Sequence, residues 1–210
     1  MYGLIVEVEG IIGSGKTTLA RQLAQELHLR LFEEPVGSNP YLSPFYKDPK
    51  AYAYRMQIYL LHRRFVMHQA AAWEAMRVGD YHGAILDRSL RGDRVFAKLH
   101  QRAGNIEGLD WDAYEFCYAA MVHMIQPPTV LLWLEVEPEK ALERIQRRAR
   151  GVEVGITVDY LRQLRDGYHD LLAEVEAGRH AWCRGVHVRR VAWNTDNQSI
   201  SGIVEELRGH

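Results

Sequence analysis

The stretch between residues 4 and 18 constrains the fold more than any other part of the chain. A β-branched apolar run ends at Gly10, and residues 10–17, Gly-Ile-Ile-Gly-Ser-Gly-Lys-Thr, match the pattern G-x-x-x-x-G-K-[ST] at every defined position. Residues 19–27 then carry leucine and alanine at helical spacing. A glycine loop between a strand and a helix N-terminus directs backbone N–H groups and the helix dipole at a polyphosphate. The stretch therefore predicts a P-loop that binds a nucleoside triphosphate.

Each residue type in this loop has a distinct expected role. The glycines let the backbone curl around the phosphates, Lys16 is expected to reach the β- and γ-phosphates, and Thr17 is expected to hold Mg²⁺. The residues predicted to contact the nucleotide here are Gly10, Gly13, Ser14, Gly15, Lys16, Thr17 and Thr18.

Composition indicates an ordinary globular protein of one α/β domain, residues 1–210, with 47% hydrophobic and 25% charged residues. A net charge of −1 gives no general attraction to nucleic acid or acidic membranes, so neither is an expected partner. No apolar run approaches the roughly 18 residues of a membrane span. Cys117 and Cys183 lack metal-ligand spacing, which favours a reduced, cytoplasmic compartment.

Strand and helix patterns alternate along the whole chain. Strands are predicted at about 4–10, 29–33, 83–87, 130–136 and 186–191, and a loop at 37–44. Helices are predicted at about 19–27, 50–79, 88–99, 110–125, 139–150, 160–176 and 200–208. The alternation predicts an α/β fold in which a parallel sheet of about five strands has helices on both faces. The strand at 130–136 is the most apolar, so we expect it at the centre.

Five motifs together carry a resemblance to a known family. They are the P-loop at 10–18, Glu34-Pro35-Val36, Tyr46…Gln57…Arg64, Asp87-Arg88-Ser89, and Arg144-xxx-Arg148-x-Arg150-xx-Glu153. This set resembles the deoxynucleoside kinases, which include the deoxycytidine, deoxyguanosine and bacterial deoxyadenosine kinases, over residues 4 to 175. The P-loop alone is common to many NTPases, whereas the combination is much more specific.

The resemblance implies a P-loop kinase fold, a three-layer sandwich with an arginine-rich lid at about residues 147–156. It also implies transfer of the ATP γ-phosphate to the 5′-hydroxyl of a deoxynucleoside in nucleotide salvage, with ATP and Mg²⁺ as cofactors. A homodimer formed through the long helices is the implied assembly.

Glu34 lies where the second strand ends before Pro35, at the sheet edge where ligands of parallel sheets bind. Phosphorylation of an alcohol removes its proton as the phosphoryl group arrives, so a carboxylate placed there is a candidate general base. In the family that it resembles, this glutamate acts on the 5′-hydroxyl. Strand alternation turns Glu33 to the opposite face, which makes it the weaker candidate. An isolated acid at a strand end would more often be merely exposed.

Asp87-Arg88-Ser89 closes an apolar strand, where an acid that binds Mg²⁺ through water is usual. Arg88 is expected to brace Glu34 and the 5′-oxygen. The family more often has glutamate at the first position, so the reach of the shorter Asp87 to the metal stays open. A helix cap made by Asp87 and Ser89 is the alternative reading.

Arg144 and Arg148 share one helix face, and Arg150 follows near the break at Gly151. Guanidinium groups stay charged and bind phosphate in a fork, so this cluster is expected to stabilise the charge that develops during transfer. Arg147 is expected to point elsewhere. The alternative is a solvated basic face that pairs with acids of the same helix, Glu139 and Glu143.

The remaining substrate contacts are implied by the resemblance. Glu153 with Tyr46 is expected to hold the 3′-hydroxyl, and Gln57 is expected to read the base, with Arg64 and Asp93 on its far side. The pair of Arg64 and Asp93 favours purine deoxynucleosides or deoxycytidine. Simple solvent exposure is the alternative for Gln57. Met56 stands where the family has an aromatic residue, so aromatic stacking on the base must come from elsewhere, and Phe96 is a candidate.

The turn at 193–197 falls where the family wraps the ATP adenine, so Asp196 is a predicted ATP contact, although a plain surface turn describes the sequence nearly as well. Two other functions remain open. A monophosphate kinase of the thymidylate kinase type would need a basic group where Glu34 stands. A non-catalytic nucleotide-binding subunit would have no need of catalytic residues, and these are intact in this sequence.

Overall fold

The computed structural model describes residues 3–34, 39–77, 83–148, 155–196 and 198–210. Five parallel strands form one sheet in the order β2-β3-β1-β4-β5. They are β1 (Leu4–Glu9), β2 (Arg30–Phe32), β3 (Gly83–Asp87), β4 (Val130–Glu135) and β5 (His187–Ala192). The predicted α/β sheet is confirmed.

The middle position belongs to β1, so the prediction that the strand at 130–136 is central was wrong by one place. The physical reason is that β1 carries two fully buried acids, Glu7 and Glu9, which make it look less apolar than β4. Their partners come from other elements: Arg91 pairs with Glu7, and Tyr168 donates to Glu9 at 2.8 Å.

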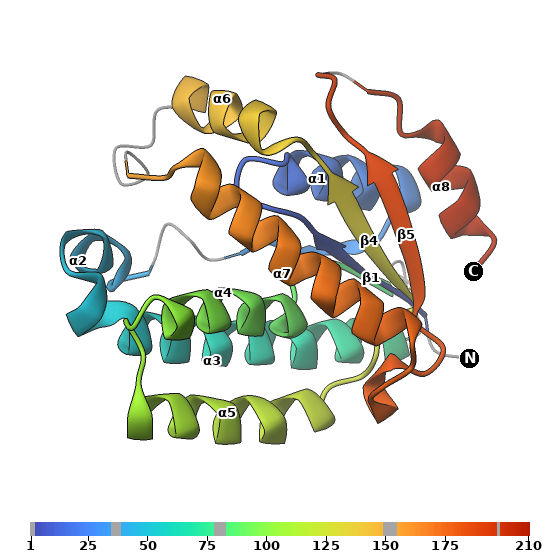
Figure 1. Cartoon of the computed structure of the whole chain (residues 1–210). Helices are drawn as coiled ribbons and strands as arrows, with labels where there is room; N and C mark the ends of the chain where they lie inside the picture. The colour runs from blue at the N-terminus through green and yellow to red at the C-terminus, as the bar shows by residue number, and fades with distance from the viewer. Residues whose placement is uncertain (1–2, 35–38, 78–82, 149–154, 197) are drawn as a thin grey trace.

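Helices cover both faces of the sheet (Figure 1). On one face lie α1 (Lys16–Leu27) and α8 (Ser201–Arg208); on the other lie α3 (Pro49–Met76), α4 (Leu90–Arg102) and α7 (Val158–Glu176). Outside α3 and α4 lies α5 (Gly108–His123), and α6 (Pro138–Arg148) follows the carboxyl end of β4. Among the described residues no helix is both long and apolar enough to cross a membrane.

Two short elements were not predicted. Residues 37–44 were expected to form a loop, but α2 (Leu42–Lys47) begins inside this range, and η2 (Ala181–Cys183) is one turn of 3₁₀ helix. Pro44 suggests a loop, yet it is the third residue of α2, where its missing N–H would have no partner within the helix. The helix places Phe45 and Tyr46 beside the carboxyl ends of the strands, where both side chains line a cavity.

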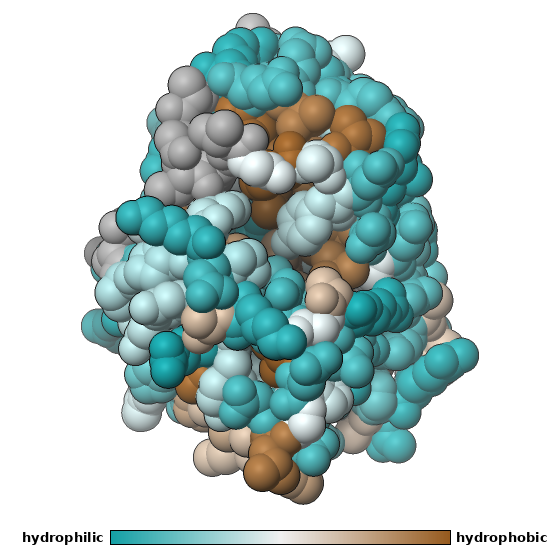
Figure 2. Space-filling view, turned by 60° about the vertical axis from the view of Figure 1, so that its left-hand side comes forward, coloured by the Kyte–Doolittle hydropathy of each residue, from teal (hydrophilic) through white to brown (hydrophobic). Residues whose placement is uncertain are grey.

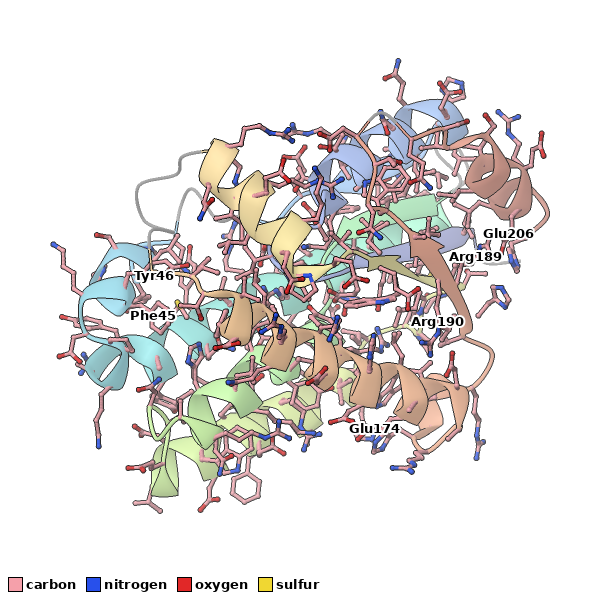
Figure 3. The ribbon with its side chains drawn as sticks, turned by 45° about the horizontal axis from the view of Figure 1, so that its top comes forward. Phe45, Tyr46, Glu174, Arg189, Arg190 and Glu206 are labelled. Atoms are coloured by element: carbon pink, nitrogen blue, oxygen red, sulfur yellow. The ribbon has the colours of Figure 1, made fainter. Side chains whose placement is uncertain are left out.

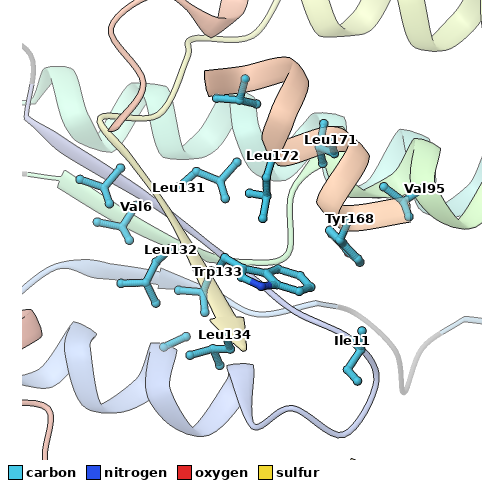
Figure 4. Packing of buried hydrophobic residues seen from close by; sticks show 14 of the residues in the cluster. Val6, Ile11, Val95, Leu131, Leu132, Trp133, Leu134, Tyr168, Leu171 and Leu172 are labelled. Carbon is cyan, nitrogen blue, oxygen red and sulfur yellow. The ribbon is translucent and has the colours of Figure 1, made fainter. Parts of the chain in front are cut away.

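The core joins the sheet to α7 through Trp133 of β4 and Tyr168 of α7 (Figure 4). Their ring centroids lie 4.9 Å apart, and both side chains are almost completely buried. Because the Tyr168 hydroxyl also reaches Glu9 of β1, this contact fixes α7 against two neighbouring strands at their carboxyl ends.

Candidate active site

A cavity of about 1160 Å³ opens at the carboxyl ends of the strands, between the P-loop, α2, α3 and α6. Figure 2 shows this side of the molecule, with hydrophobic groups between hydrophilic rims. The predicted site residues that line the cavity are Gly13, Gly15, Lys16, Thr17, Thr18, Glu34, Tyr46, Gln57, Arg64, Asp87, Arg88, Phe96, Arg144, Arg148 and Asp196. Residues far apart in the sequence therefore meet at one place. Arg150 and Glu153 lie outside the described residues.

The P-loop needs glycine at two positions. Gly13 and Gly15 have φ of 80° and 96°, in the left-handed region that favours glycine. A Cβ atom at Gly13 would also lie 2.5 Å from the Ala141 carbonyl oxygen, so α6 could not pack this closely against any other residue. The glycines thus bring α6 and its arginines to the phosphate loop.

Lys16 is buried at the first residue of α1. Its ammonium group donates to the Ile11 carbonyl at 2.8 Å and to the Ser14 hydroxyl at 3.3 Å, and Ser14 faces Lys16 rather than the cavity. Burial, followed by the charge of Arg88, lowers the pKa of Lys16 to about 7. An incoming polyanion would favour the charged form again.

Thr17 and Asp87 meet directly, since the Thr17 hydroxyl donates to Asp87 Oδ2 at 2.5 Å. Asp87 Oδ1 is buried and has no hydrogen-bond partner in the described part of the chain. Mg²⁺ bound to a nucleotide uses phosphate oxygens and water with only one or two protein ligands. A threonine hydroxyl beside a carboxylate with an unpartnered oxygen fits that demand, and the shorter Asp87 does reach the P-loop.

Glu34 is held by two arginines. Arg64 Nη2 donates to one carboxylate oxygen, and Arg88 Nε donates to the other at 2.6 Å. Burial raises the pKa of Glu34, but the charges of Arg88, Arg64 and Lys16 outweigh it and lower the pKa to about 2. Glu33 instead pairs with Arg21 of α1 at 2.6 Å, and both side chains also line the cavity. The Glu34 carboxylate therefore lies ionised and oriented in the cavity that contains the P-loop.

Arg88 reaches Glu34 from a strained backbone position. Its φ is 75°, unusual for a residue with a side chain, and its N–H donates to the Val8 carbonyl at 3.0 Å. The guanidinium also donates to Tyr168 at 3.2 Å and lies 4.9 Å from the Phe96 ring centroid. Ser89 then caps α4 by accepting from the Gly92 N–H at 3.0 Å. Residues 87–89 therefore have two roles: Ser89 caps α4, and Asp87 and Arg88 line the cavity.

Gln57 is fully buried, so the alternative of solvent exposure is wrong. Its Nε2 donates to the Asp93 carbonyl at 3.3 Å, which leaves Oε1 without a partner among the described residues. The Asp93 carboxylate does not line the cavity: it accepts from Arg64 and, at 2.6 Å, from the Tyr114 hydroxyl. Gln57 and Arg64 therefore line the cavity, while Asp93 supports them from behind.

At the opposite end, Arg144 binds the turn after β5. It donates to the Trp193 carbonyl at 3.0 Å, to Asp196 at 3.1 Å and to the Ser14 carbonyl at 3.2 Å. Neither Glu139 nor Glu143 is its partner, because these pair with Arg162 and Lys140. Arg147 also donates to Asp196, at 3.1 Å, and lines the cavity. The prediction that Arg147 points elsewhere was wrong, because one acid bridges positions three residues apart.

Comparison with known proteins matches residues 6–207 to the deoxynucleoside kinase family. The chain belongs to this family. It is 36% identical to a deoxyadenosine kinase of Dictyostelium discoideum over 194 residues, covering 92% of this chain and 74% of that protein. It is 32% identical to the deoxyadenosine/deoxycytidine kinase of Bacillus subtilis (strain 168) over 208 residues, covering 97% and 91%.

The fold agrees with this family. A deoxyadenosine kinase structure from M. mycoides with bound dCTP superposes with a TM-score of 0.82, covering 99% of this chain and 100% of the other, at 24% identity. The protein is thus a deoxynucleoside kinase, an enzyme that phosphorylates deoxynucleosides.

Among the cavity residues of this kinase that sequence reasoning missed are His100 and Tyr160. His100 of α4 lies edge-on to Phe45 with ring centroids 5.0 Å apart, and burial lowers its pKa to about 4. Tyr160 of α7 lines the cavity near Tyr46, and burial raises the pKa of its hydroxyl. Figure 3 shows Phe45 and Tyr46 on α2 beside the start of α7. His100 lies seven residues after Asp93, on one face of α4, which could have indicated it.

Proposed function

We propose that this deoxynucleoside kinase transfers the γ-phosphate of ATP to the 5′-hydroxyl of its substrate, with Glu34 as the general base. One observation carries the proposal: an ionised carboxylate is fixed by Arg64 and Arg88 in the same cavity as the P-loop lysine. Glu34 accepts the hydroxyl proton as the phosphoryl group arrives. Because the transition state of phosphoryl transfer is loose, the position of Glu34 matters more than its base strength.

Cationic side chains compensate the negative charge that moves during transfer. Lys16 and Arg88 line the cavity beside Glu34, and Arg144 and Arg148 line it from α6. Stabilisation of this kind is commonly the largest single contribution to catalysis. Arg150, in a lid at about residues 147–156, and the ATP contacts of Asp196 stay predictions.

Thr17 and Asp87 are the residues that would hold Mg²⁺. The unpartnered Asp87 oxygen and the Thr17 hydroxyl are oxygen donors of the kind that Mg²⁺ prefers. When bound, the ion supplies a positive charge that neutralises the phosphate oxygens.

The nucleoside is proposed to lie between α2, α3 and α4. Gln57 offers its free oxygen to an N–H of the base, and Phe96 provides an aromatic face. Tyr46 with Glu153 is proposed to hold the 3′-hydroxyl. The pair of Arg64 and Asp93 supports a preference for purine deoxynucleosides or deoxycytidine.

An acceptor screen tests this function. The four deoxynucleosides and their 5′-monophosphates are offered with labelled ATP and Mg²⁺, and the products are separated by chromatography. We expect a nucleoside to become its monophosphate, whereas the monophosphates stay unchanged. Phosphorylation of a monophosphate alone would favour the thymidylate kinase type, and no transfer to any acceptor would favour a non-catalytic subunit.

A homodimer is proposed through α3 and α5. Their outer faces expose large apolar side chains, with Trp73 66% exposed on α3 and Phe116 76% exposed on α5. Sedimentation velocity tests this assembly: the parent protein is expected to sediment as a dimer, and Trp73→Glu with Phe116→Glu as a monomer. A parent protein that sediments as a monomer would rule the dimer out. A cytoplasmic location stays a prediction.

A further inference from the structure

Arg64 contacts two parts of the site at once. Its Nη1 donates to Asp93 and its Nη2 donates to Glu34, while its Nε has no partner in the described chain. The side chain is 3% exposed and also lines the cavity beside Gln57. One rigid guanidinium therefore joins the base end of the cavity to the carboxylate assigned to catalysis.

The far side of Arg64 is anchored. Asp93 is completely buried and accepts from the Tyr114 hydroxyl at 2.6 Å, which ties it to α5. Tyr114 itself lines no part of the cavity. Because a planar guanidinium donates along fixed directions, fixing Nη1 on Asp93 also fixes where Nη2 holds Glu34.

We propose that Arg64 is a positioning residue for Glu34, anchored by Asp93 and Tyr114, and that it links occupancy of the base subsite to phosphoryl transfer. The inference rests on the proposed function of Glu34. A base bound at Gln57 would lie beside the Arg64 guanidinium, which orients the Glu34 carboxylate. Contacts with the base should therefore affect the rate of phosphoryl transfer as well as the affinity for the nucleoside.

Four charged groups set the ionisation of Glu34. Arg64 faces it from α3, Arg88 from the end of β3 and Lys16 from the P-loop, and Asp93 stands behind Arg64. Loss of Arg64 removes a nearby positive charge and a hydrogen bond, so the pKa of Glu34 rises. Since the ionised carboxylate is the active form, activity should then be lost at a higher pH as the solution is acidified.

The test is a double variant, Arg64→Gln with Asp93→Asn, which removes both charges and leaves no buried carboxylate unpaired. The matched control is Arg94→Gln with Glu115→Gln, which removes another ion pair between α4 and α5, 2.6 Å long and outside the cavity. Arg64→Lys is the second test variant: it keeps the charge but loses the fork.

Single-turnover rates at saturating nucleoside and ATP are measured for each variant from about pH 4 to 8, beside nucleoside binding. Because Glu34 of the parent enzyme has a pKa of about 2, the parent should show no acid limb from this carboxylate in that range. We expect the Arg64/Asp93 variant to lose about tenfold or more in rate and to show an acid limb within the range. The lysine variant should show a smaller shift, and the Arg94/Glu115 control should match the parent enzyme.

The proposal fails if the Arg64/Asp93 variant, or the lysine variant where the double variant does not fold, weakens only nucleoside binding and keeps the parent pH profile. That result would leave Arg64 as a base-reading residue alone. The parent enzyme separates this failure from failure of the proposed function, because without transfer to any deoxynucleoside the parent itself would be inactive.

Discussion

On the acceptor side of the cavity, Asp93 is buried and Glu34 is mostly buried, and both pair with Arg64. Arg88 is the second partner of Glu34. On the donor side, Asp196 bridges Arg144 and Arg147 near the surface. The Glu34 side chain is 13% exposed and that of Asp196 is 45% exposed. Buried ion pairs are poorly screened and costly to break singly, while exposed pairs contribute little and weaken in salt. The acceptor side is thus preorganised, and the donor side can rearrange around a nucleotide.

Among the substitutions considered, Glu34→Gln on the acceptor side should cause the largest loss of activity. The amide keeps the shape but cannot take a proton, so kcat should fall by about 10² to 10⁴, while nucleoside binding stays nearly intact. Steady-state kinetics and calorimetric nucleoside binding measure the two effects. Glu33→Gln is the control and should change kcat less than about twofold, because its pair with Arg21 is exposed. Loss of binding without loss of turnover would contradict the assignment.

Gly92→Ala tests how tightly the acceptor side is packed. The new Cβ would overlap the Glu9 carboxylate and lie 2.8 Å from the Tyr168 hydroxyl, two groups that support Arg88. We expect about 1–3 kcal/mol of lost unfolding free energy by denaturant titration. Gly202→Ala on α8 has open space around it and should be neutral or slightly stabilising. Equal effects at both positions would show that the acceptor side is not rigid.

Lys16 lies between the acceptor and donor sides, and its titration should make ATP affinity depend on pH. Its pKa of about 7 leaves it mostly neutral at pH 8, and the bound triphosphate favours the charged form. ATP binding at pH 8 should therefore take up about one proton and weaken by about tenfold per pH unit above 7. Calorimetry in two buffers of different ionisation enthalpy measures the uptake. No uptake would show that Lys16 is already charged in the free enzyme.

Asp196→Asn should have the smallest effect. It removes the acid that Arg144 and Arg147 share, but the Asp196 carboxylate lies near the surface, where water and salt screen both ion pairs. The KM for ATP should change by no more than about fivefold, and the difference should disappear near 1 M salt. A larger change that persists in high salt would place Asp196 among the preorganised groups.

Several parts of this arrangement were predictable from local patterns. The P-loop, the alternation of strands and helices and the position of Glu34 at a strand end all follow from residues close in the sequence. The contact of Glu34 with Arg64 spans 30 residues and that with Arg88 spans 54, so resemblance suggested the second while the first was not foreseen. The positive φ of Arg88 has no local signal, because only the packing around it holds that conformation.

By itself, the sequence determined that a triphosphate loop stands at the end of a buried strand, since spacing and glycine are enough to specify that turn. Tertiary structure alone decided which charges meet. Arg64 could have been solvated on a long helix, and only the packing of α3 against α4 and the sheet buries it between Asp93 and Glu34. The reason is physical: a side chain's charge interacts strongly only where neighbouring elements exclude water, and no local pattern states where that happens.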